Sequence, residues 1–520
     1  MNKKQKFISG GILLSLVGLA MRGVSLALGA YISRSVGAEG VGLNALVMNA
    51  YAFAFTFSTA GISLTVTALV ASAIGEGKGG KCSGVLRGAF LYAGVFGTLG
   101  TVLLSTLSGV IGRRLLSDAR AVPSLLILSF SLLPSALTSV ITGYFIGKRR
   151  VSLNASVQIF GQIARVVLTV LLLVRLAGGD VGSAVASLAV GVTLTELSVF
   201  LFSFVEFLID RRLSENEGRV KTELSAVAAS AVPLALSAYI RSALLTLEHS
   251  LIPKRLCLRG EDSSEALASY GYLHGMALPL LLYPMVPLSS FGSLLLPEFA
   301  EAKSRGERER MERIASRALG TALSYAALVA VFLFLFSEEL GYAVYSSYDA
   351  GRFIAILSPV VPIMYLDHVA DNMLKGIGEQ VYSMWVNIID ATLSVLLVFV
   401  LIPIFGIAGY AIVIIAIEAF NFFFSAVRLK KRIKYKINIL RCFLTPASLA
   451  IGSALLSKLL FSECGRDASA LVAVSKIVFA LAVYIGSYIV ISFVKKYLVF
   501  RLNYSTVSKM TISAKPKSSE

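Results

Sequence analysis

Two adjacent stretches decide the fold of this sequence: VYSMWVNIIDATLSVLLVFVLIPI at residues 381–404 and GIAGYAIVIIAIEAFNFFFSAVR at residues 406–428. Each is almost free of charge and as long as a helix that crosses a hydrocarbon core of about 30 Å. A backbone in lipid has to satisfy its own hydrogen bonds, and segments of this length do so as helices. The two stretches therefore predict two consecutive transmembrane helices.

Similar apolar blocks occur along the whole chain, at 7–31, 41–72, 86–111, 122–147, 151–175, 183–209, 222–252, 267–297, 314–337, 352–374, 441–461 and 469–494. Of the 520 residues, 56% are hydrophobic and only 15% are charged, and the mean hydropathy is +0.79. This composition is too apolar for a soluble protein of such length. We predict an all-α integral membrane protein of about fourteen transmembrane helices.

The net charge of +18 comes from Lys and Arg residues that lie mostly between the apolar blocks. With the N-terminus inside, the cytoplasmic breaks hold about three times as many basic residues as the outer breaks. Loops rich in Lys and Arg stay in the cytoplasm, so this bias predicts that both termini are cytoplasmic and argues against nucleic acid as the partner. The start, MNKKQKF, precedes a long apolar stretch without a small-residue cleavage site, and we expect a retained first helix rather than a signal peptide.

An internal repeat relates the two halves of the chain. Gly147 and Ser152 recur as Gly378 and Ser383, 231 residues later, and TLTELSVFLFS around Glu196 resembles IAIEAFNFFFS around Glu418. Such a repeat predicts two six-helix bundles related by a pseudo-two-fold axis along the membrane normal, followed by two further helices. The expected parts are 1–212 (first bundle), 213–318 (helices 7 and 8 with a cytoplasmic connector), 319–436 (helices 9 to 12), 437–497 (helices 13 and 14) and 498–520 (a cytoplasmic tail).

Three arginines, Arg22, Arg165 and Arg241, fall inside the apolar blocks. A charge at the centre of a membrane helix costs about 2.5 to 3.5 kcal/mol on insertion scales, so such residues face a cavity or a partner. Guanidinium groups bind phosphate through paired hydrogen bonds and stay charged, which would suit an anionic substrate. The alternative is a local ion pair, such as Arg165 with Glu196 or Arg241 with Glu248.

Acidic residues also occur inside the predicted helices, and all are candidates for ion coupling: Glu196, Glu248, Asp367, Asp371, Asp390 and Glu418. Asp367 and Asp371 share one helix face at i, i+4 spacing. A carboxylate pair in a membrane can hold Na⁺ or a proton and so couple transport to an ion gradient. The alternative is a cluster at a helix end in which Asp371 and its neighbour pair with Lys375.

Two uncharged polar positions complete the candidate cavity. His274 lies beside Pro279, where a helix should bend, and is either a packing residue or a contact for substrate or protons. Asn49 belongs to a second helix that is polar along much of its length. Such a helix either faces a wet cavity or forms hydrogen bonds with its neighbours.

No motif for covalent chemistry is present in the sequence. The four cysteines, Cys82, Cys257, Cys442 and Cys464, have no metal-ligand spacing, and there is no nucleotide loop or nucleophile elbow. We therefore expect no cofactor and no metal site, and a transporter rather than an enzyme. A membrane glycan polymerase would be the enzymatic alternative, but it would need an acid or histidine in a sizeable outer loop, and these loops are short. A monomer in contact with membrane lipids is expected.

Several segments resemble one known family. VGAEGVGL from Val36, FSTAGISLTVTALVA from Phe57 and LSPVVPIMYLDHVADNMLKGIGEQVYSMWVNIID from Leu357 are similar to the stage V sporulation protein B group, as are IPKRL, HGMALPL and FGIAGYA. That group belongs to the polysaccharide exporter branch of a superfamily that also holds lipid II flippases and multidrug and toxic compound extrusion antiporters. The resemblance implies a V-shaped pair of bundles, alternating access, and a lipid-linked oligosaccharide or peptidoglycan precursor with its pyrophosphate in a central cavity.

The resemblance also assigns individual positions. Arg22 matches a cavity arginine of the lipid II flippases, whereas Leu28 replaces a second arginine and His274 lies where another occurs. The implied cavity is less cationic than in those flippases, and Arg241 would compensate. We therefore predict a flippase-type transporter of a lipid-linked cell-envelope glycan precursor, for peptidoglycan, spore cortex or polysaccharide, in the bacterial cytoplasmic membrane. The alternative is a multidrug antiporter of the same fold coupled to Na⁺ or H⁺.

Overall fold

The computed structural model describes residues 3–75, 79–176, 178–212, 222–461 and 471–490, and these ranges contain helices and no strand. The α-helices are α1 (Lys3–Thr59), α2 (Ile62–Gly75), α3 (Gly79–Val110), α4 (Ala121–Ser129), α5 (Leu132–Gly147), α6 (Val151–Leu176), α7 (Val181–Arg212), α8 (Leu224–Cys257), α9 (Ser263–Tyr270), α10 (Leu278–Leu282), α11 (Val286–Ser304), α12 (Arg308–Leu335), α13 (Ser337–Tyr345), α14 (Tyr348–Leu357), α15 (Val361–Gly376), α16 (Gln380–Phe405), α17 (Ile407–Arg432) and α18 (Thr445–Leu460). A final helix covers Leu471–Val490. The predicted all-α class is confirmed.

Eleven helices of the described residues are long and apolar enough to cross a membrane, or twelve if the bent pair α4 and α5 forms one span. The count of fourteen thus stays a prediction. The count of eleven treats α1 and α2 as part of one span, although Gly37 divides α1 with φ 71° and ψ 178°. It also leaves out the stretch from α9 to α11, where irregular turns separate the helices. The predicted tail from residue 498 lies outside the described residues.

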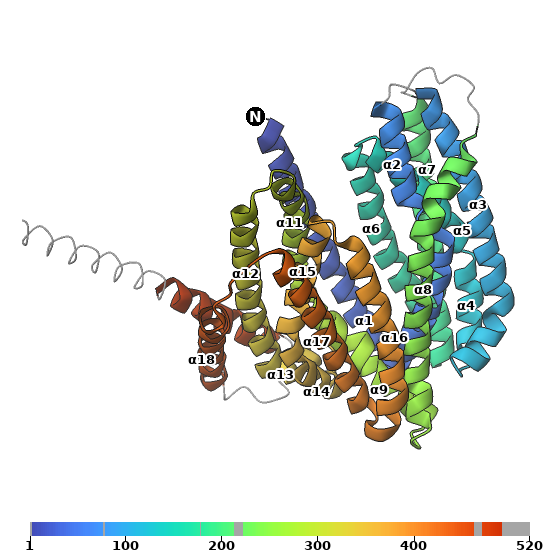
Figure 1. Cartoon of the computed structure of the whole chain (residues 1–520). Helices are drawn as coiled ribbons and strands as arrows, with labels where there is room; N and C mark the ends of the chain where they lie inside the picture. Colours follow the sequence, from blue (N-terminus) through green and yellow to red (C-terminus); the bar gives the residue numbers. More distant parts are fainter. Residues whose placement is uncertain (1–2, 76–78, 177, 213–221, 462–470, 491–520) are drawn as a thin grey trace, which may run out of the picture.

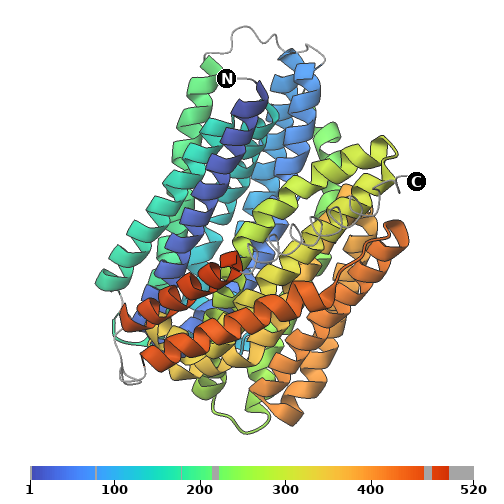
Figure 2. The ribbon, with the colours of Figure 1, turned by 90° about the vertical axis from the view of Figure 1, so that its left-hand side faces the viewer.

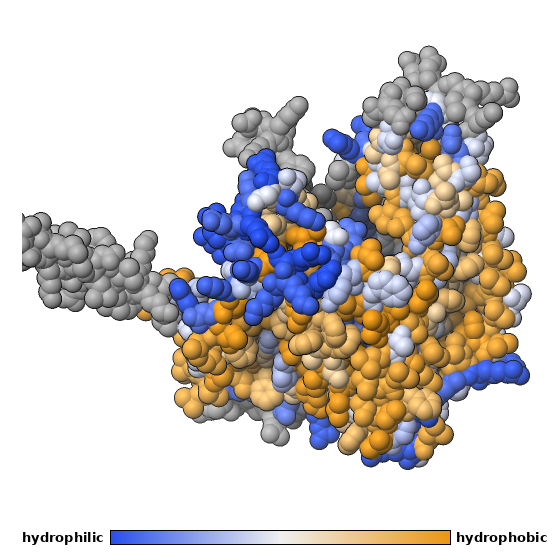
Figure 3. Space-filling view, in the orientation of Figure 1, coloured by the Kyte–Doolittle hydropathy of each residue, from blue (hydrophilic) through white to orange (hydrophobic). Residues whose placement is uncertain are grey.

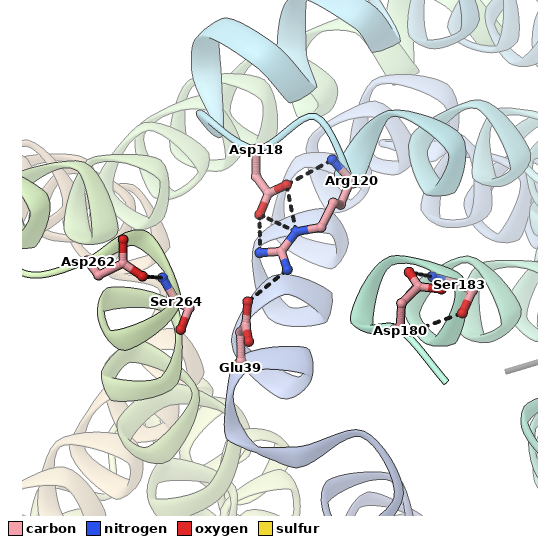
Figure 4. Close-up of polar contacts among 7 residues, drawn as sticks. All are labelled: Glu39, Asp118, Arg120, Asp180, Ser183, Asp262 and Ser264. Atoms are coloured by element: carbon pink, nitrogen blue, oxygen red, sulfur yellow. Dashed lines mark hydrogen bonds and ion pairs between the residues drawn. The ribbon is translucent and has the colours of Figure 1, made fainter. Parts of the chain in front are cut away.

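The bend at Gly37 is held in place by an ion cluster. Glycine reaches this positive φ without a Cβ clash, which lets the chain turn there. Close to the bend, Arg120 donates to Glu39 of α1 at 2.8 Å and to Asp118 through Nη2, also at 2.8 Å. Figure 4 shows the Arg120 side chain between the two carboxylates. Arg120 therefore ties α1 to the segment between α3 and α4.

The helices form two groups that can be followed in Figures 1 and 2. One group contains α2, α3, α5, α6 and α7, and the other contains α12, α15, α16 and α17, with α18 packed on α12. Two helices link the groups. Helix α8 packs on α3 of the first group and on α16 of the second, and α1 packs on α3 and α7 of the first group and on α11, which in turn packs on α15 of the second. A side chain at Gly61 would meet the carbonyl of Ala231 in α8 at 2.5 Å, so the α1–α2 break lies directly on α8.

The stretch from α9 to α11 is irregular where the sequence predicts a bend. A π-helical turn covers Gly271–Ala277 and a 3₁₀ turn covers Tyr283–Met285. Pro279, Pro284 and Pro287 have no backbone N–H to donate, so the helical hydrogen-bond pattern is weakened at three places within nine residues. π-Turns inside helices are frequent at functional sites, and this one carries His274.

The outer surface of both groups is largely apolar. In Figure 3 hydrophobic residues cover most of the visible sides of the helices, while hydrophilic residues gather at the ends. Exposed side chains include Leu64, Val174, Leu236, Val381 and Leu459, each more than half exposed. A surface of this kind is suited to lipid, and together with the apolar helices it defines a multi-pass membrane protein.

Candidate functional site

A polar cavity of about 420 Å³ lies within the second group of helices. Its wall is formed by α8, α10, α15, α16 and α17. The ionisable lining residues are Arg241, Glu248, His249, Asp367, His368, Asp371, Lys375, Asp390 and Glu418. Five of the six predicted acidic residues therefore meet in one cavity, although α8 and α17 are far apart in sequence.

Hydrogen bonds hold several of these carboxylates. Asn421 donates to Asp390 at 2.6 Å, and the hydroxyls of Ser394 and Ser425 interact with the Glu248 and Asp367 carboxylates. One oxygen of Asp367, Oδ1, is buried and has no partner among the described residues. A buried oxygen without a donor costs free energy unless something else binds it, so this side of the cavity is suited to a cation or a proton.

Asp371 forms the ion pair with Lys375 that the sequence suggested as the alternative to ion coupling. Its carboxylate lies 2.5 Å from Nζ of Lys375, one turn along α15. Asp367, one turn earlier, does not share that ion pair. Lys375 therefore balances the charge of Asp371. Asp367 forms no ion pair with a described residue and is the one available to a ligand.

Of the two arginines, Arg241 is among the residues that line this cavity and Arg22 is not. Arg241 lines it from α8. Arg22 on α1 interacts electrostatically with the His368 imidazole, which also lines it. Neither guanidinium lies within 4.0 Å of a carboxylate oxygen of any described residue. Arg241 does interact electrostatically with the Asp390 carboxylate across the cavity, although the two form no direct ion pair.

His274 and Asn49 belong to an aromatic cluster at the edge of the cavity, where α1, α8 and the π-turn meet. The ring of His274 stacks on Tyr270, with centroids 5.1 Å apart, and approaches His249 at 4.3 Å. Asn49 donates to the Tyr270 hydroxyl at 3.2 Å, and Thr246 of α8 donates to the Asn49 carbonyl at 3.1 Å. Asn49 thus joins neighbouring helices through hydrogen bonds, and His274 makes packing contacts.

A second cavity of about 380 Å³ lies in the first group, between α1, α6 and α7. Arg165 and Glu196 line it and form an ion pair at 3.8 Å. Glu196 also accepts a hydrogen bond from Ser135 at 2.9 Å. The remaining lining is mainly apolar, including Leu28, Met48 and Phe55. Arg165 is therefore paired locally, in contrast to Arg22 and Arg241.

Sequence reasoning missed five polar residues of the 420 Å³ cavity: His249, His368, Asn387, Ser394 and Asn421. Asn387 lies three residues before Asp390 on α16, and Asn421 three after Glu418 on α17. Residues at this spacing share a helix face. That spacing was the available signal, and it would have placed both amides beside the acidic residues already named.

The fold and the cavities define a multi-pass membrane protein with polar chambers inside its helix bundles. Residues 7–303, over half of the chain, match the family of polysaccharide biosynthesis proteins. The chain belongs to this family. Residues 256–400 also match the MatE family.

The comparisons with individual proteins agree with this assignment. Stage V sporulation protein B of Bacillus subtilis (strain 168) is 25% identical over 423 residues, which cover 79% of this chain and 81% of that protein. Sporulation protein YkvU of the same organism is 19% identical over 359 residues, 68% of this chain and 79% of that protein. The predicted resemblance is confirmed.

Two solved structures share the fold. The lipid II flippase MurJ in an inward closed conformation superposes with a TM-score of 0.71 at 14% identity, covering 94% of this chain and all of MurJ. An inward-facing multidrug resistance transporter of the MATE family gives a TM-score of 0.66 at 16% identity, covering 79% of this chain and 94% of that protein. This chain therefore shares the fold of both transporters.

Proposed function

We propose that this protein is a flippase-type transporter that exports a lipid-linked cell-envelope glycan precursor by alternating access. Membership in the polysaccharide biosynthesis family supports the cargo class. The relative named stage V sporulation protein B favours a precursor of peptidoglycan or spore cortex. The observation that carries the proposal is Arg241 in the lining of the polar cavity, with Arg22 on α1 exerting an electrostatic influence on His368 of the same lining and neither arginine in a direct ion pair with a described carboxylate.

In this mechanism Arg22 and Arg241 bind the pyrophosphate of the lipid carrier. Guanidinium donors match phosphate oxygens in paired geometry and cannot lose their proton, so they hold the anion throughout the cycle. His274 and Asn49 lie at the edge of the cavity and adjoin the same chamber. Arg165 is a weaker candidate for substrate contact because it already pairs with Glu196.

The carboxylates of the same cavity supply the coupling step. Asp367, Asp390, Glu418 and Glu248 would take up Na⁺ or a proton, and the charge so gained would offset the repulsion between these carboxylates and an anionic cargo. Glu196, in the second cavity, stays a further candidate for ion coupling, paired with Arg165. Asp371 would act through its ion pair with Lys375.

We further propose how the protein is oriented in the cell membrane. Both termini would be cytoplasmic, and the chain would act as a monomer in the bacterial cytoplasmic membrane. The bundles would be formed by residues 1–212 and 213–436, with 437–497 as two additional helices. The links that α1 and α8 form between the helix groups would make these two helices the elements that change partners during the cycle.

Reconstituted liposomes test this function. Flipping of a fluorescent polyprenyl-pyrophosphate oligosaccharide should be lost in Arg22→Ala and in Arg241→Ala. Arg352→Ala is the matched control, since this arginine is exposed and pairs with Asp349 outside both cavities. Undiminished flipping in both cavity variants, with normal incorporation into the liposomes, would refute the assignment.

A second candidate function is a multidrug antiporter of the same fold, coupled to Na⁺ or H⁺. The acidic lining of the larger cavity favours it, because carboxylates attract cationic drugs as well as coupling ions. The discriminating measurement is drug resistance on overexpression. Resistance that disappears in Asp367→Asn and Glu418→Gln, together with absent flipping of the lipid-linked sugar, would favour the antiporter.

A further inference from the structure

The segment that joins α17 to α18 is strongly basic. Residues 428–441 read RLKKRIKYKINILR, with no acidic residue among them. In Figure 1 the segment runs past α12 towards α18. The backbone amide of Lys436 donates to Ser316 of α12 at 3.0 Å, which fixes the segment against that helix.

The segment has one apolar side and one basic side. Ile433 is 3% exposed, and Tyr435 and Ile437 pack against the main core, whereas Lys434 and Lys436 are exposed. Ile433 has an extended backbone, with φ −136° and ψ 124°. Alternate side chains of an extended chain point to opposite sides, so seating the apolar residues on the protein turns Lys434 and Lys436 outward. Lys430 and Lys431 are exposed on the last turn of α17.

Little negative charge balances these side chains. Glu379 pairs with Arg428 and with Arg432, each at 2.6 Å. Lys430, Lys431, Lys434, Lys436 and Arg441 have no carboxylate of a described residue within 4.0 Å. Arg313 and Arg317, exposed on α12 beside the segment, extend the same surface. Figure 3 shows hydrophilic residues gathered on this end of the helix group.

Two exposed apolar side chains follow Lys436 within four residues. Ile439 is 66% exposed and Leu440 is 69% exposed. Leu440 opens the candidate membrane span Leu440–Leu460. The basic residues therefore stand at the level where a helix enters the bilayer. Basic side chains beside exposed apolar ones are typical of surfaces that bind the interface of an anionic membrane.

We propose that Lys430, Lys431, Lys434, Lys436 and Arg441 form a binding surface for the headgroups of anionic phospholipids, with Ile439 and Leu440 in the acyl region beneath. This 430–441 surface is separate from both cavities, and the proposal does not depend on the cargo. A soluble anion would leave Ile439 and Leu440 in water, so the occupant is a lipid of the surrounding bilayer. Bound lipid neutralises the lysines and seats the start of α18.

The test uses the full-length protein and counts retained lipids by native mass spectrometry, with dioleoyl phosphatidylglycerol and dioleoyl phosphatidylcholine as probes. Wild type should retain phosphatidylglycerol in preference to phosphatidylcholine. The variant K430Q/K431Q/K434Q/K436Q should bind phosphatidylglycerol at least about tenfold more weakly, because each lysine near an anionic surface contributes on the order of 1 kcal/mol. K430R/K431R/K434R/K436R, which keeps the charge, should behave as wild type.

The matched control R87Q/R149Q/R175Q/R308Q removes the same number of exposed positive charges from scattered positions. It should keep phosphatidylglycerol binding. Equal loss in the control and in the lysine variant would mean that net charge alone attracts the lipid, and the surface would be rejected. Displacement of phosphatidylglycerol by millimolar glycerol 3-phosphate would likewise overturn the proposal, because it would indicate a site for soluble anions.

Discussion

The imidazole rings of His249 and His274 lie 4.3 Å apart, centroid to centroid, at the junction of α8 with the π-turn. Tyr270 contacts both rings, and His249 is only 8% exposed. Nδ1 of each histidine is buried without a hydrogen-bond partner among the described residues. Ring packing rather than hydrogen bonding through these atoms therefore holds the junction together.

Replacing His249 with Ala should destabilise the protein. The substitution removes a buried ring from contact with two others and enlarges the polar cavity that His249 lines, and this loss of packing should cost on the order of 2 kcal/mol. The apparent Tm in detergent should fall by several degrees. His249→Phe keeps the ring contacts and should recover most of the loss; a Tm for His249→Ala equal to wild type would contradict this account.

Gly42 marks a second close contact, between α1 and α9. A Cβ on Gly42 would lie 2.0 Å from the carbonyl oxygen of Leu267, and one on Gly271 would lie 2.2 Å from that of Ala38. Backbone atoms cannot move aside as a flexible side chain can, so Gly42→Ala must push α1 and α9 apart.

We expect Gly42→Ala to lower both the apparent Tm and the transport rate. Gly29→Ala is the control in the same helix, because a Cβ at Gly29 meets nothing within 4 Å. Alanine favours helix over glycine by about 0.5 to 1 kcal/mol, so the control should be neutral or slightly stabilising. Similar losses in both variants would point to helix propensity rather than to the contact at Leu267.

Periodic and compositional signals in the sequence predicted most of the fold. Long apolar blocks predicted the helices, and Pro279 predicted the irregularity that the π-turn and the 3₁₀ turn produce. The kink at Gly37 falls between the predicted blocks 7–31 and 41–72, whereas the break between α1 and α2 at Gly61 falls inside the predicted block 41–72 and was harder to foresee. A single glycine can bend a helix or end it, and the sequence alone does not decide which.

Side-chain pairing within the cavity could be predicted only in part. The i, i+4 spacing of Asp371 and Lys375 predicts their ion pair, because that distance is set by one helix. The contact of Asn421 with Asp390 depends on the packing of α16 against α17, and that of His249 with His274 on two helices separated by a loop. Such contacts are set by tertiary packing and leave no short-range signature.

Glu379, in the turn between α15 and α16, should make stability depend on pH. The hydrogen bond from Arg428 holds the pKa of this carboxyl below its usual value, with a further contribution from Arg432. Folding therefore favours the ionised form. The resulting stabilisation is complete above the pKa of an unfolded glutamate, about 4.3, and is lost as the pH falls through the lowered pKa.

The variant Glu379→Gln isolates this effect. Its apparent Tm should lie below that of wild type by a constant amount from pH 6 to 8, and the difference should shrink below about pH 4 as Glu379 of the wild type becomes protonated. Other carboxylates titrate in both proteins and cancel in the comparison. A difference that stays constant down to pH 3 would show that the Arg428 contact does not depend on charge.

Cys257 offers a direct test of the predicted orientation. It is an exposed free cysteine at the end of α8, and the positive-inside bias places the following loop outside the cell. With Cys82, Cys442 and Cys464 replaced by Ser, a membrane-impermeant maleimide should label Cys257 in intact cells. A Lys434→Cys variant without the four native cysteines should react only after permeabilisation, because the segment between α17 and α18 is predicted to be cytoplasmic. The opposite labelling pattern would invert the topology and place the 430–441 surface against the outer leaflet.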